Sequence, residues 1–173
     1  MTDKQPYDVL REFPGFELRH YPDYVLVQLE VEGDFQGAGN RGFGPLFRYI
    51  SGGNQTATRI AMTAPVIQEA TSPVTHTVSF VLPHGMDPAD VPVPSDAGVH
   101  TTRVPAHRAA ARRFSGGWSE ARFAANGEEL LGSVRRAGLT AEGRPYFARF
   151  DPPWKPGFLK HNEALVAVAG SGI

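Results

Sequence analysis

Hydrophobic residues near the N-terminus alternate with polar ones, which is the period of a strand half-buried in a sheet. Phe16 and Leu18 form one such run, and Val25, Val27, Leu29 and Val31 form a second. The segment Tyr21-Pro22-Asp23 lies where the parity changes. A turn or bulge there would let both runs face the same core, so we expect two strands joined at this point.

The spacing then changes to that of a helix. Phe43, Leu46, Phe47 and Ile50 follow the i, i+3, i+4, i+7 pattern, with Asp34 available as an N-cap and Gly52-Gly53-Asn54 closing the segment. This pattern predicts a helix over residues 36–51 with one apolar face. From spacing alone that face is the core side of the helix.

The rest of the chain repeats this order of elements. We expect strands over residues 59–69 and 75–82, a Pro-rich surface crossover over 83–98, a weak strand over 103–114, a helix from Ser119 to near Gly138, and strands over 144–150 and 164–169. Phe35 matches Trp118 and Arg59 matches Arg144, at offsets of 83 and 85 residues. These offsets suggest pseudo-duplicated β-α-β-β units, about 14–83 and 99–170. The predicted fold is α+β: a distorted antiparallel β-barrel of about eight strands with two helices.

Composition narrows the classes of protein to consider. The chain has 173 residues, 41% of them hydrophobic and 20% charged, which fits a single domain over 1–173. Lys and Arg number 17 against 18 Asp and Glu, without blocks of one sign, so no nucleic-acid partner is expected. The absence of cysteine excludes disulfides, thiolate haem ligation and iron–sulfur clusters. No secretory signal or membrane-spanning run is visible, so we expect a cytoplasmic, bacterial-like protein without a membrane partner.

Three stretches resemble the SOUL/haem-binding-protein family, in the order and at the spacing found there. They are Phe16-Glu17-Leu18-Arg19-His20-Tyr21, Arg59-Ile60-Ala61-Met62-Thr63-Ala64-Pro65-Val66, and Asp151-Pro152-Pro153-Trp154-Lys155-Pro156 through Asn162-Glu163. With the helix ending Phe47-Arg48-Tyr49-Ile50-Ser51-Gly52, the likeness spans nearly the whole chain. It is specific for the fold and much less specific for the ligand.

The resemblance implies non-covalent binding of haem or a related porphyrin in a shallow apolar groove. In the family this groove is thought to lie between the first helix and the loop before the last strand. Carried over to this chain, its lining is Phe43, Leu46, Phe47 and Arg48 from the helix, and Phe150, Trp154, Lys155, Lys160 and His161 from the loop. His20 is the implied candidate for the axial iron ligand, and His161 is the competing candidate.

Each candidate also has a structural explanation. Phe43 and Phe47 could belong to the core, and His20 could be a partly buried histidine bonded to the backbone. Asn162-Glu163 fits a cap or turn, and we expect surface positions for the remaining histidines, His76, His84, His100 and His107.

Three functions stay open at this point. The first is a soluble tetrapyrrole carrier, buffer or sensor, with no catalytic residue. The second is a haem-dependent enzyme, peroxidase-like or haem-degrading, although no classical enzyme motif appears. The third is an effector-binding domain of the same fold that recognises small molecules with Glu69, Glu163 or Asp151. Nothing in the sequence indicates an oligomeric state.

Overall fold

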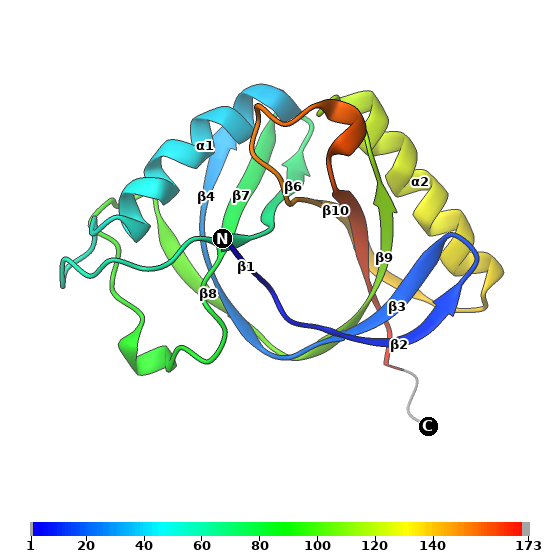
Figure 1. Ribbon diagram of the computed structural model, residues 1–173, viewed down its shortest axis with the longest axis horizontal. Helices are drawn as coiled ribbons and strands as arrows, with labels where there is room; N and C mark the ends of the chain where they lie inside the picture. Colours follow the sequence, from blue (N-terminus) through cyan, green and yellow to red (C-terminus); the bar gives the residue numbers. More distant parts are fainter. Residues whose placement is uncertain (1, 171–173) are drawn as a thin grey trace. The chain divides into compact units, whose positions relative to one another are not determined.

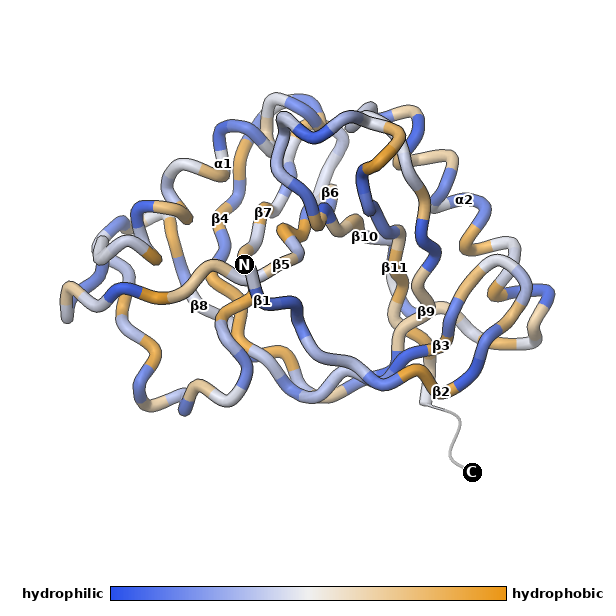
Figure 2. The backbone as a smooth tube through the Cα atoms, viewed as in Figure 1, coloured by the Kyte–Doolittle hydropathy of each residue, from blue (hydrophilic) through white to orange (hydrophobic). Residues whose placement is uncertain are grey.

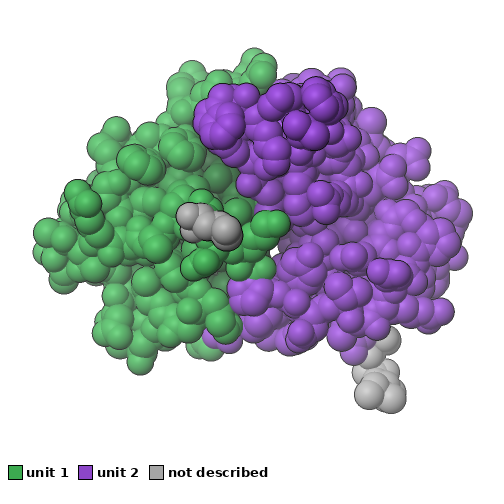
Figure 3. Space-filling model, viewed as in Figure 1, with its two compact units in different colours: residues 1–5, 24–104 green, residues 6–23, 105–173 purple. Residues whose placement is uncertain are grey.

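A computed structural model describes residues 2–170 of the chain. Two compact units make up this part of the chain (Figure 3). Unit 1 contains the N-terminal residues through Gln5 together with Tyr24–Val104, and unit 2 contains Pro6–Asp23 together with the residues from Pro105 onward. Each unit is therefore assembled from two separate stretches of sequence.

Unit 1 is a helix on an antiparallel sheet. Its elements are β1 (Asp3–Lys4), β4 (Tyr24–Glu32), α1 (Phe35–Ile50), β5 (Thr63–Ala64), β6 (Val66–Ser72), β7 (Thr75–Val81), a 3-10 turn (Pro88–Asp90) and β8 (His100–Val104). The strand order is β6-β7-β4-β8, and β1 and β5 form a separate parallel pair. Helix α1 packs on β4 and β7 (Figure 1). Val27, Leu46, Val78 and Phe80 are among the core residues that this packing buries.

Unit 2 has the same construction. Its elements are β2 (Asp8–Phe13), β3 (Phe16–Tyr21), β9 (His107–Phe114), α2 (Glu120–Arg136), β10 (Ala141–Arg149), a 3-10 turn (Gly157–Leu159) and β11 (Asn162–Val168). The strand order is β2-β3-β9-β11-β10, all antiparallel. Helix α2 packs on β9, β10 and β11, and Phe16, Leu130, Val134 and Val166 lie in the core below it.

The two units confirm the α+β class and the β-α-β-β repeat. In β4-α1-β6-β7 and in β9-α2-β10-β11, the last of the three strands lies between the other two in the sheet. Along both helices, hydrophilic and hydrophobic stretches alternate, as expected for helices with one side on a sheet (Figure 2). The antiparallel strands number nine rather than about eight, because β2 adds a strand that the sequence pattern does not reveal.

The compact units do not coincide with the contiguous pseudo-repeats 14–83 and 99–170. Strand β3 comes from the first half of the sequence but pairs with β9, whereas β8 comes from the second half but pairs with β4. Only Pro22-Asp23 separates β3 from β4, and only Pro105-Ala106 separates β8 from β9. The two halves of the sequence thus exchange one strand.

Several element boundaries differ from the sequence prediction for identifiable reasons. The predicted strand 59–69 begins only at β5, and Pro65 separates it from β6. The predicted strand 103–114 is divided at Pro105 into β8 and β9. Both predicted N-caps are confirmed, since Asp34 accepts from Gly37 N and Ser119 accepts from Arg122 N. Within residues 2–170, neither helix is long and apolar enough to cross a membrane.

Candidate functional site

Helix α1 presents two phenylalanine rings outside the core of unit 1. Phe43 is 43% exposed and Phe47 is 49% exposed, although the same helix buries Leu46 and Ile50 completely or nearly so. The two rings are stacked with centroids 5.8 Å apart, and Phe43 meets the edge of Phe80 at 5.2 Å. The assignment of Leu46 and Ile50 to the core is therefore confirmed, whereas Phe43 and Phe47 form an exposed aromatic ridge.

The last turn of α1 adds a positive charge beside this ridge. Arg48 directly follows Phe47 and is exposed. A guanidinium in this position can form two parallel hydrogen bonds to a carboxylate without first breaking a buried contact. The helix thus offers a flat apolar surface together with one available cation.

In unit 2, the loop between β10 and β11 also exposes apolar side chains. Trp154 is 82% exposed, and Phe158 and Leu159 are exposed beside it in the sequence. Lys155 lies in the same loop, but its Nζ is 2.7 Å from Asp151 Oδ1. Burial tends to raise the pKa of Asp151, but the bonds from Lys155 and from His161 N–H outweigh it and lower that pKa. The charge of Lys155 is therefore already partly neutralised.

Lys160 occupies a different environment from Lys155. It is buried, with its Nζ 3.8 Å from the ring centroid of Trp118. The guanidinium of Arg149 lies 5.0 Å from the same ring, and burial lowers the pKa of Arg149 to about 10. Trp118 Nε1 donates to Asn162 Oδ1, which fixes the ring. The Lys160 ammonium is thus held by a cation–π contact inside unit 2.

His161 is oriented by its neighbours on both sides. Phe150 stacks on its ring at 4.1 Å, and Nε2 lies 2.9 Å from Glu163 Oε2. A carboxylate partner favours the tautomer with the proton on Nε2, which leaves the lone pair on Nδ1. If His161 bound a metal in this arrangement, Nδ1 would be the ligating atom.

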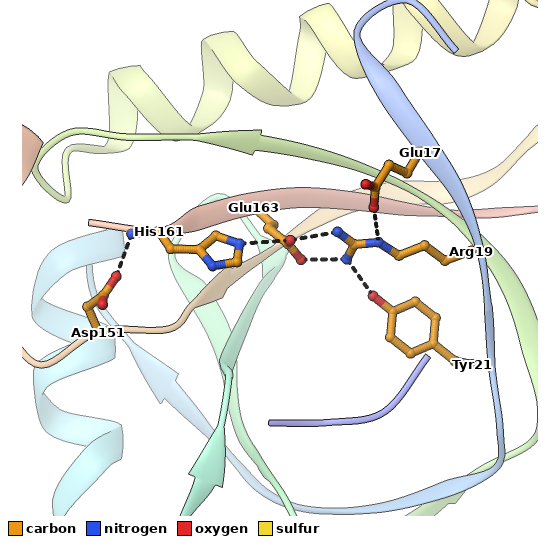
Figure 4. Close-up of polar contacts among 6 residues, drawn as sticks. All are labelled: Glu17, Arg19, Tyr21, Asp151, His161 and Glu163. Carbon is orange, nitrogen blue, oxygen red and sulfur yellow. Dashed lines mark hydrogen bonds and ion pairs between the residues drawn. The ribbon is translucent and has the colours of Figure 1, made fainter. Parts of the chain in front are cut away.

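Glu163, which contacts His161, also pairs with Arg19, and these two residues form the centre of a buried network (Figure 4). Arg19 donates to both oxygens of Glu163, at 2.7 and 2.8 Å, and also to Tyr21 and Glu17. Burial raises the pKa of Glu163, but the bonds from Arg19 and His161 outweigh this effect and lower the pKa to about 2. Glu163 is consequently a carboxylate at neutral pH although it is fully buried.

His20 lies on the other face of the unit 2 sheet from this network. Successive residues of a strand point to opposite faces, so His20 shares the face of Leu18 while Arg19 faces Glu163. His161 reaches Glu163 and therefore lies on the face of Arg19. The two candidate ligands thus cannot bind one iron together. Residues 2–170 contain no group of three or more His, Asp or Glu side chains placed to hold a metal ion.

A pocket of about 380 Å³ opens within unit 2 beside the buried network. We call it the hairpin pocket, because Tyr7, Phe13 and Glu17 from the β2–β3 hairpin line one part of it. Arg113 from β9 and Glu163 from β11 line another part. Its volume is at the lower end of the range of small-molecule sites, about 300 to 1,000 Å³.

Sequence reasoning missed this network and misplaced residues in both units. Asn162 and Glu163 are not a cap or turn but the buried start of β11. His76 is not at the surface either: it is buried beside Phe35, and among the described side chains its Nδ1 has no hydrogen-bond partner. Strand parity would have placed Arg19 on the face opposite Leu18, but its partner Glu163 is 144 residues away and leaves no local signal.

Comparison with known proteins identifies the family. The family model described as SOUL heme-binding protein matches residues 2–167, which is nearly the whole chain. This chain belongs to the SOUL haem-binding protein family. The prediction made from the three sequence stretches is thereby confirmed. A curated relative, Heme-binding protein 2 of Mus musculus, is 35% identical over 103 residues, which cover 56% of this chain and 50% of that protein. The matched region thus spans about half the length of the mouse relative.

Solved structures share the fold of this SOUL protein at low sequence identity. The C-terminal domain of EcmrR matches with a TM-score of 0.65 and 14% identity, covering 94% of this chain and 98% of that one. A hydrolase from Listeria innocua gives 0.60 and 12%, covering 92% and 94%. SAV2435, bound to tetraphenylphosphonium, gives 0.54 and 11%, covering 90% and 94%. At such identities the likeness establishes the fold alone.

Proposed function

We propose that this SOUL protein binds haem or a related porphyrin non-covalently and acts as a carrier or buffer of the tetrapyrrole. The observation that carries the proposal is the exposed aromatic ridge of Phe43 and Phe47 on α1. An amphipathic helix normally buries its largest apolar residues, so two stacked rings left half in solvent need an apolar partner. Because the chain belongs to a haem-binding family, we infer that this partner is a flat macrocycle such as a porphyrin.

The residues present fit the chemistry of such a ligand. A porphyrin has two apolar faces and carboxylate side chains, so it requires aromatic surfaces and at least one cation. Phe43, Phe47 and Arg48 of unit 1 supply both. Trp154 and Lys155 of unit 2, with Phe150 and Lys160, remain predicted contacts. Bound haem would supply a redox-active iron, and the chain itself would hold and orient the ring.

The contacts of the acidic residues favour this proposal over a generic effector-binding domain. Recognition of a cationic effector requires a carboxylate that is free to pair with it. Glu163 is already bonded to Arg19 and His161, and Asp151 is bonded to Lys155 and His161 N–H. Neither carboxylate can pair with a cationic ligand without losing a charged partner.

A haemin titration followed at the Soret band tests the proposal. We expect a stable Soret shift with the wild type and a loss of affinity of about tenfold or more in the double variant Phe43→Ala/Phe47→Ala. The matched control is Val74→Ala/Val93→Ala, which removes two exposed apolar side chains elsewhere in unit 1 and should bind as the wild type does. Equal binding by both double variants would rule out the α1 surface. A wild type that gives no Soret shift would refute tetrapyrrole binding itself.

A comparison of haemin with its dimethyl ester isolates the role of Arg48. The ester keeps the macrocycle but lacks both carboxylates, so Arg48→Gln should weaken haemin and leave the ester unchanged. A variant that weakens both ligands equally would show that Arg48 does not act on the carboxylates. In the same assay, His20→Ala and His161→Ala report by the position of the Soret band whether either histidine binds the iron.

A further inference from the structure

The hairpin pocket is the feature of unit 2 that haem binding on α1 does not use. It lies beside a network of charged side chains that are almost completely buried, with Arg19 and Glu163 at its centre. Buried charges of this kind are costly unless every bond is formed, and here the geometry is bidentate. The floor of the hairpin pocket is therefore built from side chains with fixed positions.

This floor carries an excess of negative charge. Arg19 is its one guanidinium, whereas Glu17 and Glu163 are both bonded to it as carboxylates. Glu17 uses Oε2 for this bond, and within the described part of the chain Oε1 has no partner. Glu12 lies directly across the hairpin from Glu17 and also lines the pocket. The free carboxylate oxygens of Glu12 and Glu17 could therefore bind an ammonium group.

A positive charge that is available to a ligand lies on β9. Arg113 lines the pocket and is exposed, and its guanidinium forms no hydrogen bond or ion pair with any residue in 2–170. It lies directly across the sheet from Glu163, whose oxygens Arg19 and His161 already occupy. Tyr7 lines the same pocket, and burial raises the pKa of its phenol while the charge of Arg19 acts in the opposite direction. Arg113 is thus available to an external carboxylate.

Apolar surface separates these two charged sides. Tyr7 and Phe13, which are not fully buried, line the pocket, whereas the Phe16 ring on which Phe13 stacks at 4.8 Å belongs to the core below α2. The ring of Tyr7 covers the Arg19 guanidinium at 3.9 Å. A small ligand could therefore place an aromatic or aliphatic body against these rings while its ends meet charges of opposite sign.

We propose that the hairpin pocket binds a small zwitterion of the amino-acid type. Arg113 receives its carboxylate, Glu12 and Glu17 receive its ammonium, and Tyr7 and Phe13 contact its side chain. The pocket is lined by Arg19, Arg112 and Arg113 and by Glu12, Glu17 and Glu163, so its fixed charges balance. A ligand with no net charge and two charged ends complements such a site better than a simple anion or cation does.

Three probes with the same phenyl body test this proposal by isothermal titration calorimetry. They are L-phenylalanine, 3-phenylpropionate, which lacks the ammonium, and 2-phenylethylamine, which lacks the carboxylate. We expect phenylalanine to bind about tenfold or more tightly than either analogue, because each analogue leaves one charged side of the pocket unpaired. Failure of phenylalanine to bind at millimolar concentration, or equal binding of either analogue, would overturn the proposal.

Substitutions of the exposed charged residues test which side chain binds each end of the ligand. Arg113→Gln should remove the advantage of phenylalanine over phenylethylamine, and Glu12→Gln should reduce its advantage over phenylpropionate. Arg144→Gln, an exposed arginine on β10 outside the pocket lining, is the matched control and should leave all three affinities unchanged. An equal effect of Arg113→Gln and Arg144→Gln would show that only the overall charge matters. The haemin titration is a separate readout, so the two proposals can fail independently.

Discussion

At the scale of single residues, the Arg19–Glu163 pair shows how charge can be buried in a small domain. The carboxylate accepts two bonds from Arg19 and a further one from His161. Tyr21 accepts from Arg19, and burial raises the pKa of its phenol, so it stays protonated at physiological pH. Each member thus depends on another, and the loss of one leaves a charge without compensation.

Removing only one partner of this pair should therefore cost more than removing both. We expect Arg19→Met to lower the free energy of unfolding by about 3 to 5 kcal/mol, because Glu163 stays buried without its main partner. The double variant Arg19→Met/Glu163→Leu should recover much of this loss. Urea unfolding of the wild type and the two variants at pH 7 measures both values. A double variant less stable than Arg19→Met would contradict the expectation.

The same pair should contribute to the stability of the protein in acid. The pKa of Glu163 is lowered from 4.5 to about 2, so its contribution is complete above about pH 4.5 and is lost as the pH falls towards 2. The double variant lacks this carboxylate and should lose stability less steeply over that range. Urea unfolding at pH 5, 4 and 3 compares the slopes. Identical slopes would mean that Glu163 does not titrate as described.

At the scale of elements, helix α1 is shaped by glycines that are not equivalent. A Cβ added at Gly42 would lie 2.8 Å from Val78 Cβ, which is too close, whereas at Gly44 its nearest neighbour is Arg48 Nη1 at 3.8 Å. Gly42 thus allows α1 to approach β7 closely. Gly44 has no such contact with the sheet, but it precedes Pro45, whose Cδ would crowd a Cβ on a helical residue at this position.

Two alanine substitutions in α1 should consequently have different effects. Gly44→Ala should change the free energy of unfolding by less than about 1 kcal/mol, because the crowding of the new Cβ against Pro45 opposes the gain in helix propensity. Gly42→Ala gains the same propensity but must displace Val78, and we expect a net loss of about 1 to 3 kcal/mol. Thermal or urea unfolding of both variants measures the two changes. A stabilising Gly42→Ala would show that α1 can move away from β7 at little cost.

The helices and strands could be predicted well where residues close in sequence determine them. They could be predicted less well where a strand forms only by pairing with a distant one. Asp34 and Ser119 begin the two helices as expected, because a cap acts within three residues of itself. Strand β2 has mostly exposed side chains and no alternating pattern, so only its pairing with β3 reveals it. The exposure of Phe43 and Phe47 also could not be read from spacing, because a helical period does not say how wide the buried face is.

The candidate site could also be predicted only in part from the sequence. Family resemblance pointed to Arg48 and Trp154, and both are exposed as a ligand contact requires. It also pointed to Lys160, which is instead buried against Trp118. The hairpin pocket remained invisible in the sequence, because its parts come from strands that are adjacent only after the chain has folded.

At the scale of the whole molecule, the exchange of strands ties the two halves of the sequence to each other. Unit 1 needs β8 from the second half, and unit 2 needs β2 and β3 from the first. The link between Arg19 and Glu163 also joins the first half of the sequence to its last strand. This connectivity is the basis for keeping the prediction of a single domain over 1–173.

A chain cut within the 83–98 crossover tests that prediction. We expect the fragments 1–90 and 91–173 each to lack a stable fold, because β4 in the first would lack its neighbour β8 and β9 in the second would lack β3. Mixing the two fragments should restore the circular dichroism spectrum of the intact chain and yield a one-to-one complex on size exclusion. A fragment that folds cooperatively by itself would contradict the single-domain assignment.

The exchanged strands also set an order in which the protein can be completed during its synthesis. The β2–β3 hairpin leaves the ribosome before the rest of unit 2, and its neighbour β9 follows more than 80 residues later. Unit 1 can close once residue 104 has emerged, and β9 begins directly afterwards, at His107. The hairpin therefore waits with an open edge strand while most of unit 1 is made, and during this period it should be most exposed to aggregation.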